Sequence, residues 1–457
     1  MSTYDLIIRG GILVTQDRGE VVEDLGIYAG RIAAIEPHIE GTAPDELDAT
    51  GLHVFPGVID AHVHFNEPGR TEWEGLTSGS RAAAAGGTTT FFDMPLNSHP
   101  PVLDADSFDR KRASAEAASL VDFGLWGGLV PGNLDRLEEL AERGVVGFKA
   151  FMSNSGIEDF PMCDDLTLYE GMARAAGLDC IVAVHAENEQ ITSGLARRAI
   201  AGGHTGVRDF LNSRPAIAEV EAIRRAITFA EDTGCALHIV HVSTGRGVAL
   251  VAEARARGVD VSCETCPHYL AFTGEDVERL GGIAKCAPPI RSREEQQALW
   301  QALLDGTLPM VASDHSPSLP SMKEGEDFFR VWGGIAGCQS LLAVLLTEGH
   351  AARKMPTSMV ARFTSYYVAE RFGISHLKGR LEVGADADLA LVDMESTYTL
   401  QASDLFYRHR LSPYVGKTFR GRVVRTLVRG VTVFQDGKIM SRPAGRLVRP
   451  RRKTVAK

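Results

Sequence analysis

The sequence predicts an α/β protein: a (β/α)8 TIM barrel with a small β-sandwich domain formed from both chain ends. Between residues 55 and 376, short apolar segments alternate with amphipathic stretches, a pattern typical of βαβ units. The segments on either side of this region are rich in short strands. An open doubly wound sheet is the alternative. No glycine-rich dinucleotide motif follows the first apolar strand, which disfavours that option.

The smaller domain is expected to combine residues 1–54 with residues 377–457. Glycine and charged turn residues in the first part separate four predicted strands, at 4–9, 12–15, 22–29 and 31–36. The second part contains an apolar run of strand length, followed by a hairpin whose turn is Arg429-Gly430, with strands at 387–393, 423–428 and 431–434. The simplest account is that the two ends pair into one β domain beside the barrel.

The barrel is predicted over residues 55–376. Its clearest helix runs from Pro215 to Asp232, because proline suits a first helical turn and Val220, Ile223 and Ile227 recur at helical spacing. The eight predicted strands are 58–64, 88–94, 121–130, 145–151, 181–186, 236–242, 259–265 and 309–314. In such a barrel the active site lies at the C-terminal ends of the strands.

Composition restricts the possible partners and the compartment. A net charge of -11 argues against nucleic acid or an anionic membrane as the main partner. Seven cysteines over 457 residues do not suggest a disulfide framework, so we expect a reducing, cytoplasmic setting. No signal peptide and no membrane span are expected. Seven Lys or Arg residues follow from Arg442 onward, and a solvated flexible tail is expected there.

Candidate metal ligands occur where the predicted strands end. His62 and His64 occupy alternate positions and therefore point to the same side of a strand. Further strands end in the other candidates, which are Lys149, His185, His241 and Asp314. A barrel brings these ends to one rim. Imidazole and carboxylate ligands without a thiolate suit zinc and, less selectively, cobalt, manganese or nickel.

Each candidate taken alone has an ordinary structural explanation. His185 and His241 could be core histidines, and Asp314 could cap a helix. His238 lies within a predicted strand but not at its end, and His268 lies on a later loop. Both are expected to support the site or to be structural. Five strand ends carrying such residues are much less probable by chance than any single one.

Two further features of these strands have separate interpretations. Lys149 ends an apolar strand, where an ammonium is costly and loses its proton easily. As a neutral amine it could react with CO2 to give a carbamate that bridges two metals. Cys263 and Cys266 form a CxxC pair, but no second thiol pair lies at zinc-binding spacing. We therefore interpret these cysteines as packing residues.

The chain resembles the cyclic amidohydrolases of the amidohydrolase superfamily, and most specifically the allantoinase family. The superfamily motifs are PGVIDAHVH at 56–64, SDHS at 313–316 and GADADL at 384–389. The motifs typical of the allantoinase family are HFNEPGRTEWEG at 64–75, DMPLNS at 93–98, KAFM at 149–152, CETCPHYL at 263–270 and KCAPPIR at 285–291. The resemblance covers essentially the whole chain.

The resemblance implies a binuclear metal centre. His62 and His64 would bind one metal with Asp314, and His185 and His241 would bind the other. Carboxylated Lys149 and a hydroxide would bridge the pair, which is expected to be zinc, with cobalt, manganese or nickel also compatible. Asp314 would act as general base and then as general acid.

The residue at position 66 bears on which ring is opened. Dihydroorotase-like chains carry Arg where this chain has Asn66, and a neutral amide suits an uncharged substrate better than a carboxylate. Asn97 and the backbone at Ala287 resemble substrate contacts of the wider group. The glycine-rich loop 333–337 could close near the ring or be a simple tight turn.

The function implied is allantoinase activity, the metal-dependent hydrolysis of allantoin to allantoate in purine catabolism. A hydantoinase or dihydropyrimidinase is the alternative. A non-catalytic scaffold with the same fold is disfavoured because all six ligand positions are present. The resemblance also implies a homotetramer.

Overall fold

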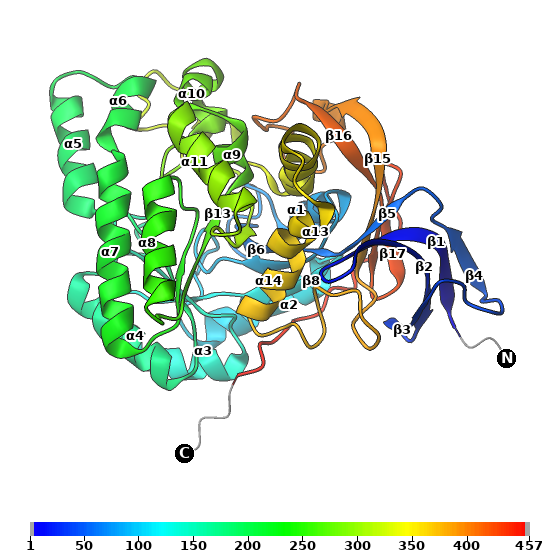
Figure 1. Cartoon of the computed structure of the whole chain (residues 1–457). Helices are drawn as coiled ribbons and strands as arrows, with labels where there is room; N and C mark the ends of the chain where they lie inside the picture. The colour runs from blue at the N-terminus through cyan, green and yellow to red at the C-terminus, as the bar shows by residue number, and fades with distance from the viewer. Residues whose placement is uncertain (1–3, 453–457) are drawn as a thin grey trace.

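A computed structural model describes residues 4–452 of the chain and shows a β domain beside a barrel (Figure 1). The β domain takes strands from both ends of the chain. The first group is β1 (Leu6–Thr15), β2 (Gly19–Tyr28), β3 (Arg31–Glu36), β4 (Asp45–Asp48) and β5 (His53–Pro56). The second group is β15 (Leu389–Thr399), β16 (Thr418–Val428), β17 (Val431–Gln435) and β18 (Lys438–Ile439).

The two groups form one sheet in the order β18-β17-β16-β15-β5-β1-β2-β3, with β4 paired to β1. The join is the antiparallel pair of β5 and β15, in which Pro56 lies opposite Leu389. Leu25, Leu389 and Leu427 belong to the apolar core that the strands enclose. The expected pairing of the chain ends is therefore confirmed.

The barrel contains nine short strands with parallel pairing. They are β6 (Val58–Val63), β7 (Thr88–Asp93), β8 (Asp122–Leu125), β9 (Gly127–Gly128), β10 (Phe148–Phe151), β11 (Val182–His185), β12 (Leu237–Ile239), β13 (Val261–Thr265) and β14 (Met310–Val311). The predicted strand 121–130 is divided into β8 and β9 at Trp126, whose indole donates to the carbonyl of Ala61 at 3.1 Å. Val63 bridges in parallel to His315 after β14, which closes the ring and confirms the predicted barrel.

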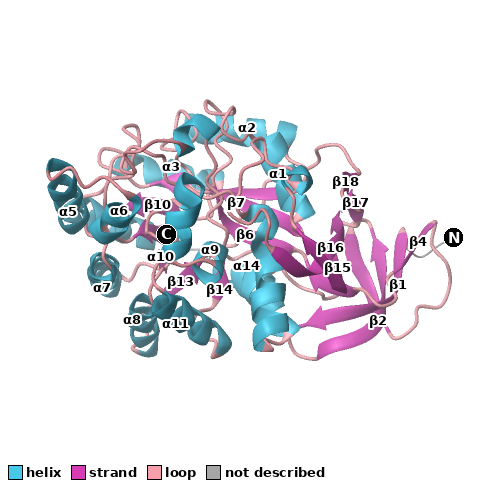
Figure 2. Ribbon diagram, turned by 90° about the horizontal axis from the view of Figure 1, so that it is seen from above, coloured by secondary structure: helices cyan, strands magenta, loops and turns pink. Residues whose placement is uncertain are grey.

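Helices surround the barrel strands (Figure 2). The helix predicted from Pro215 is α7, which buries Val220, Ile223 and Ile227 and ends at Gly234 in a left-handed conformation. The α-helices are α1 (Leu76–Ala85), α2 (Ala105–Ala118), α3 (Leu137–Arg143), α4 (Asp165–Gly177), α5 (Glu189–Ala201), α6 (Val207–Ser213), α7 (Ala216–Thr233), α8 (Gly245–Ala256), α9 (Pro267–Ala271), α10 (Gly274–Leu280), α11 (Arg293–Leu304), α12 (Leu341–Val344), α13 (Thr357–Ala361) and α14 (Tyr367–Arg371).

An ion cluster connects the barrel to the β domain. The ammonium of Lys378 lies 2.5 Å from Asp122 at the start of β8 and 2.7 Å from Asp388, next to β15. Asp386 is a third partner at 2.9 Å, and Arg429 pairs with Asp122. Burial by itself lowers the pKa of Lys378, but the three carboxylates outweigh it and raise the pKa above its usual value.

The basic segment near the end of the sequence is docked, so the expectation of a solvated tail is wrong for its described part. Val448 is 5% exposed, and its N–H donates to the carbonyl of Phe123 at 2.7 Å. Arg452 donates to the carbonyls of Ala141 and Val145 at 2.5 and 2.6 Å. The Arg452 guanidinium therefore binds backbone carbonyls of the barrel domain. Residues 453–457 lie outside the described part of the chain.

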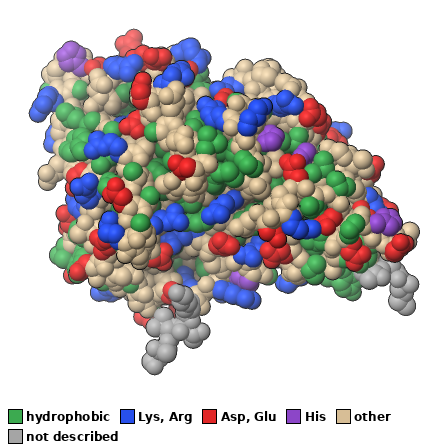
Figure 3. Space-filling view, in the orientation of Figure 1, with side chains coloured by type: hydrophobic (Ala, Val, Ile, Leu, Met, Phe, Trp, Pro, Cys, Tyr) green, Lys and Arg blue, Asp and Glu red, His purple; other side chains and the backbone are tan. Residues whose placement is uncertain are grey.

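Charged side chains of both signs lie interspersed on the face of the molecule seen in Figure 3. Within residues 4–452, no helix combines the length and the apolar character that a bilayer span requires.

Candidate active site

The structure brings all six predicted metal ligands to one cavity at the C-terminal ends of the barrel strands. The cavity has a volume of about 480 Å³. His62 lies in β6, Lys149 in β10 and His185 at the end of β11, whereas His241 and Asp314 lie two and three residues beyond the ends of β12 and β14. His64, two residues after His62, completes the set, so residues far apart in sequence meet because parallel strands end at one rim.

The four imidazoles and one carboxylate form two neighbouring groups. His62 Nε2 lies 3.2 Å from Asp314 Oδ1, and His64 Nε2 lies 3.5 Å from the same oxygen. His185 Nδ1 lies 3.1 Å from His241 Nε2. The rings of His62 and His241, whose centroids are 5.4 Å apart, connect the two groups.

The backbone at two of these residues is held in an uncommon conformation. His241 has φ of 40° and Asp314 has φ of 45°, in the left-handed region that side chains other than glycine rarely adopt. Such strain persists only where the surrounding structure fixes it, and it clusters at functional sites. Both residues turn out of short barrel strands at the rim, so the strain directs their side chains into the cavity.

Buried carboxylates fix the proton positions on two of the histidines. Glu264 accepts from His62 Nδ1 at 2.6 Å, and Glu187 accepts from His185 Nε2 at 2.9 Å. A carboxylate only accepts, so those nitrogens carry the protons. The lone pairs of His62 Nε2 and His185 Nδ1 then face Asp314 and His241. Lone pairs that converge on one another and on a carboxylate fit divalent cations, and the carboxylate–histidine arrangement is typical of metal sites.

Burial favours the neutral form of the imidazoles of His64, His185 and His241. It lowers the pKa of His64 and of His185 below the usual value, in spite of the carboxylates beside them. Burial, together with the neighbouring His185 and Lys149, lowers the pKa of His241 well below that value. Neutral imidazole is the form that binds metal ions.

Lys149 lines the same cavity, and its amine is partly neutral near pH 7. Burial lowers its pKa to about 7, against the opposing effect of Asp314 and Glu264. Among residues 4–452, its Nζ has no hydrogen-bond partner. An uncharged, unpaired amine at this place has the chemistry that carbamate formation requires.

Of the two histidines predicted to support the site, His238 is linked to it through Glu264. This carboxylate bridges His62 to His238, whose Nε2 lies 3.1 Å away, and His238 Nδ1 contacts Ser262 at 2.8 Å. His268 is fully buried, and within the described chain neither ring nitrogen is hydrogen-bonded. Cys263 and Cys266 are buried free thiols, and burial raises the pKa of Cys263 to about 12.

The structure separates the predicted substrate contacts into two kinds. Asn97 and Ala287 line the cavity, as do Gly333 and Gly334 of the glycine-rich loop. Asn66 does not line it. The Asn66 side chain is buried, and its Nδ2 donates to the carbonyl of Pro317 at 3.3 Å, so it supports the loop after Asp314.

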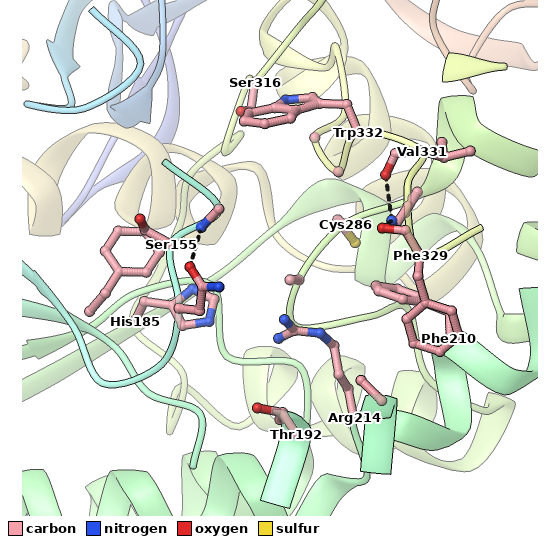
Figure 4. Close-up of a pocket in the computed structure, with 18 of the residues that line it drawn as sticks. Ser155, His185, Thr192, Phe210, Arg214, Cys286, Ser316, Phe329, Val331 and Trp332 are labelled. Carbon is pink, nitrogen blue, oxygen red and sulfur yellow. Dashed lines mark hydrogen bonds between the residues drawn. The ribbon is translucent and has the colours of Figure 1, made fainter. Parts of the chain in front are cut away.

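Sequence reasoning missed part of the cavity wall. Figure 4 shows Arg214, Phe210 and Trp332 around the cavity. Arg214 pairs with the fully buried Glu187, so one carboxylate joins this arginine to His185. The sequence signal for Arg214 was Glu187, an acid two residues after the strand-end His185, because a buried acid requires a partner.

Two lysines fix the part of the cavity wall formed by residues 328–334, because they donate hydrogen bonds to its backbone carbonyls. Lys285 donates to Phe328 at 2.6 Å and to Val331, a contact marked in Figure 4. Lys323 donates to Trp332 at 3.1 Å. The segment 328–334, which carries several cavity residues, is therefore anchored at several points.

A (β/α)8 barrel with histidines, a lysine and an aspartate at its C-terminal rim defines the class of metal-dependent hydrolases. The pattern of the Amidohydrolase family matches residues 53–433, and the chain belongs to that family.

Individual relatives are similar over nearly their whole length. The allantoinase of Rubrobacter xylanophilus is 61% identical over 452 residues, covering 99% of both chains. The allantoinase of Solibacter usitatus is 56% identical over 452 residues, covering 99% of this chain and 98% of the relative. The solved L-hydantoinase (dihydropyrimidinase) from Arthrobacter aurescens has a TM-score of 0.95 and 34% identity, covering 98% of this chain and 100% of that one.

Proposed function

We propose that the protein is an allantoinase, which hydrolyses the hydantoin ring amide of allantoin to give allantoate. The observation that carries this proposal is the 61% identity to an allantoinase over 99% of both chains. The convergence of all six expected ligands on one cavity supports a working site. A hydantoinase or dihydropyrimidinase is the second candidate, favoured by the TM-score of 0.95 to an enzyme of that name.

The donor set suits two divalent metal ions. His62, His64 and Asp314 would hold one, His185 and His241 the other, with Lys149 carboxylated on Nζ contributing to both. We propose zinc, and the same donors accept cobalt, manganese or nickel. When bound, such ions would acidify the attacking water and polarise the scissile carbonyl.

Asp314 is the residue proposed to move the proton. Burial by itself raises its pKa, but His62 and His64 outweigh burial and hold the pKa well below its usual value. The ionised carboxylate accepts a proton from the attacking water and delivers it to the ring nitrogen. The water oxygen stays on the acyl carbon, the ring C–N bond breaks, and the nitrogen leaves protonated.

Substrate orientation is assigned to neutral groups at the rim. Asn97 and the backbone at Ala287 offer hydrogen bonds to a polar, uncharged ring, since both line the cavity. The Asn97 amide lies 3.5 Å from the Ser316 hydroxyl, which fixes its direction. Asn66 is proposed to act only through the loop it supports.

We also propose a cytoplasmic homotetramer. The reducing compartment is supported by seven free, buried cysteines. The tetramer rests on the resemblance to cyclic amidohydrolases, and light scattering of the purified protein tests it: a mass near 49 kDa would contradict it.

A substrate panel tests the function directly. Initial rates with allantoin, hydantoin, dihydrouracil and dihydroorotate give four values of kcat/KM. We expect allantoin to be turned over best. A preference for hydantoin or dihydrouracil would transfer the assignment to the second candidate.

Removal of the Lys149 amine tests the metal site. Lys149→Ala should lose bound metal, measured by elemental analysis, and lose activity with it. Lys438→Ala, a change at an exposed lysine of the β domain, is the matched control. Full metal content and activity in the Lys149 variant would refute the carbamate role.

A further inference from the structure

One charged side chain in the cavity wall has no place in the chemistry described so far. Arg214 follows α6, and its guanidinium points into the cavity (Figure 4). Its side chain is 19% exposed. An arginine at this depth adds a planar fork of N–H donors to the cavity wall, next to the aromatic ring of Phe210.

Neighbouring residues hold Arg214 in one position. Its NH1 nitrogen donates to Glu187, and the guanidinium lies 5.8 Å from the ring centroid of Phe210. Arg291 donates to the Arg214 carbonyl, which fixes the backbone as well. Because Glu187 is also bonded to His185, the arginine has a fixed relation to the proposed metal ligands.

The rest of the fork is available for binding. Within residues 4–452, Nε and NH2 of Arg214 have no hydrogen-bond partner, and neither is sealed from the cavity. The other nearby cations differ: Lys285 is bonded to backbone carbonyls, and the Arg330 side chain is 88% exposed. Unlike Lys285 and Arg330, Arg214 is therefore a partly buried cation that has unpaired N–H donors at the cavity.

The charge balance indicates what kind of group Arg214 receives. Arg214 and the fully buried carboxylate of Glu187 form an ion pair, since Arg214 NH1 donates to Glu187 Oε2. The Arg214–Glu187 pair is thus neutral overall. Such a pair offers directed N–H donors and adds no net charge of its own to the wall, which suits a neutral carbonyl acceptor.

We propose that Arg214 is a specificity residue that binds the ureido arm of the substrate. Its Nε and NH2 groups donate to the urea carbonyl oxygen. The inference rests on the proposed function, because allantoin carries this arm and hydantoin does not. A ring with an apolar arm would leave the guanidinium desolvated and unpaired, and sites built for a hydrogen bond reject such analogues strongly.

The test compares two substrates in matched variants. Arg214→Met removes the donors, and Arg214→Lys keeps a cation beside Glu187 but loses the fork. Arg330→Met removes a cavity cation that is largely exposed, so it controls for charge alone. For each variant, kcat/KM is measured with allantoin and with hydantoin, together with metal content and circular dichroism.

We expect both Arg214 variants to lower the allantoin-to-hydantoin ratio of kcat/KM by roughly 10- to 100-fold. The Arg330 variant should leave the ratio unchanged. Disturbance of Glu187 and His185 would slow both substrates equally and would not move the ratio. A ratio that stays within about twofold of the wild-type value in both Arg214 variants would overturn the inference.

The wild-type protein separates this inference from the proposed function. If it does not prefer allantoin, the proposed function fails first. If it prefers allantoin and the Arg214 variants keep that preference, only the arginine assignment fails. If neither variant folds, the wild-type protein is tested instead with a hydantoin that carries an isobutyl arm. This arm is similar in shape to the ureido arm. Turnover of that compound by the wild type as efficiently as allantoin would refute the role of Arg214.

Discussion

Replacing Lys378 by methionine tests whether the ion cluster joins the barrel to the β domain. Lys378 is 2% exposed and touches three carboxylates between 2.5 and 2.9 Å. Methionine retains the length and the apolar stem but leaves Asp388 without its cation and Asp386 with only Arg31, 3.9 Å away. Removing one partner of a buried ion pair costs about 3–5 kcal/mol, because the other charge remains desolvated.

This free energy converts to a measurable shift in melting temperature. With about 2.1 cal/mol/K of unfolding entropy per residue, a chain of 457 residues has about 1 kcal/mol/K in total. The expected decrease in Tm is therefore about 3–5 °C. Activity at 25 °C should be preserved, since Asp122 lies at the start of β8, at the opposite end of the barrel strands from the cavity.

Differential scanning calorimetry is the assay, with Lys438→Met as the control because Lys438 is an exposed lysine in the same domain. A second variant, Lys378→Met with Asp388→Asn, should recover part of the lost stability, because it removes one of the unpaired charges. A decrease in Tm below about 1 °C, or no larger than in the control, would show that the cluster does not carry the assigned energy.

Three further predictions concern other parts of the molecule. Lys285→Met should loosen the segment 328–334, which chymotrypsin would then cleave faster at Phe328; an unchanged cleavage rate would contradict the anchoring role. Val448→Asp places a charge in a buried contact and should lower Tm by about 2–4 °C, whereas Val431→Asp, at a site 57% exposed, should not; equal shifts would argue against docking of this segment. Burial raises the pKa of Cys235 to about 12, so a thiol reagent at pH 8 should leave the native cysteines intact and modify all seven after denaturation.

The strands of the barrel, and the candidate ligands at their C-terminal ends, could be predicted from the sequence. Regular alternation of apolar and amphipathic segments predicted the barrel, and the structure has a strand at each predicted position. His62, Lys149 and Asp314 could be placed together because parallel strands of a barrel end at one rim. Their convergence depends on topology alone and needs no knowledge of the loops.

Features that depend on loop conformation were not predictable in the same way. Asn66 follows a strand end like the residues that line the cavity, yet it is absent from the lining and its amide donates to the carbonyl of Pro317. Arg214 reaches the cavity from a segment between two helices, and no periodic pattern marks such a position. The basic segment at Arg452 appeared solvated by composition, but backbone carbonyls under the barrel bind its guanidinium.

The pairing of β5 with β15 has a consequence for synthesis of the chain. β1, β2 and β5 leave the ribosome early, but β15 follows only after more than 300 further residues. At about 5–20 residues per second, the edge of the early strands stays unpaired for roughly 15–70 s. During that time the nascent chain presents an open β edge, the kind of surface that pairs with other chains. Production of this protein should therefore be sensitive to chaperone supply and to translation speed across the barrel.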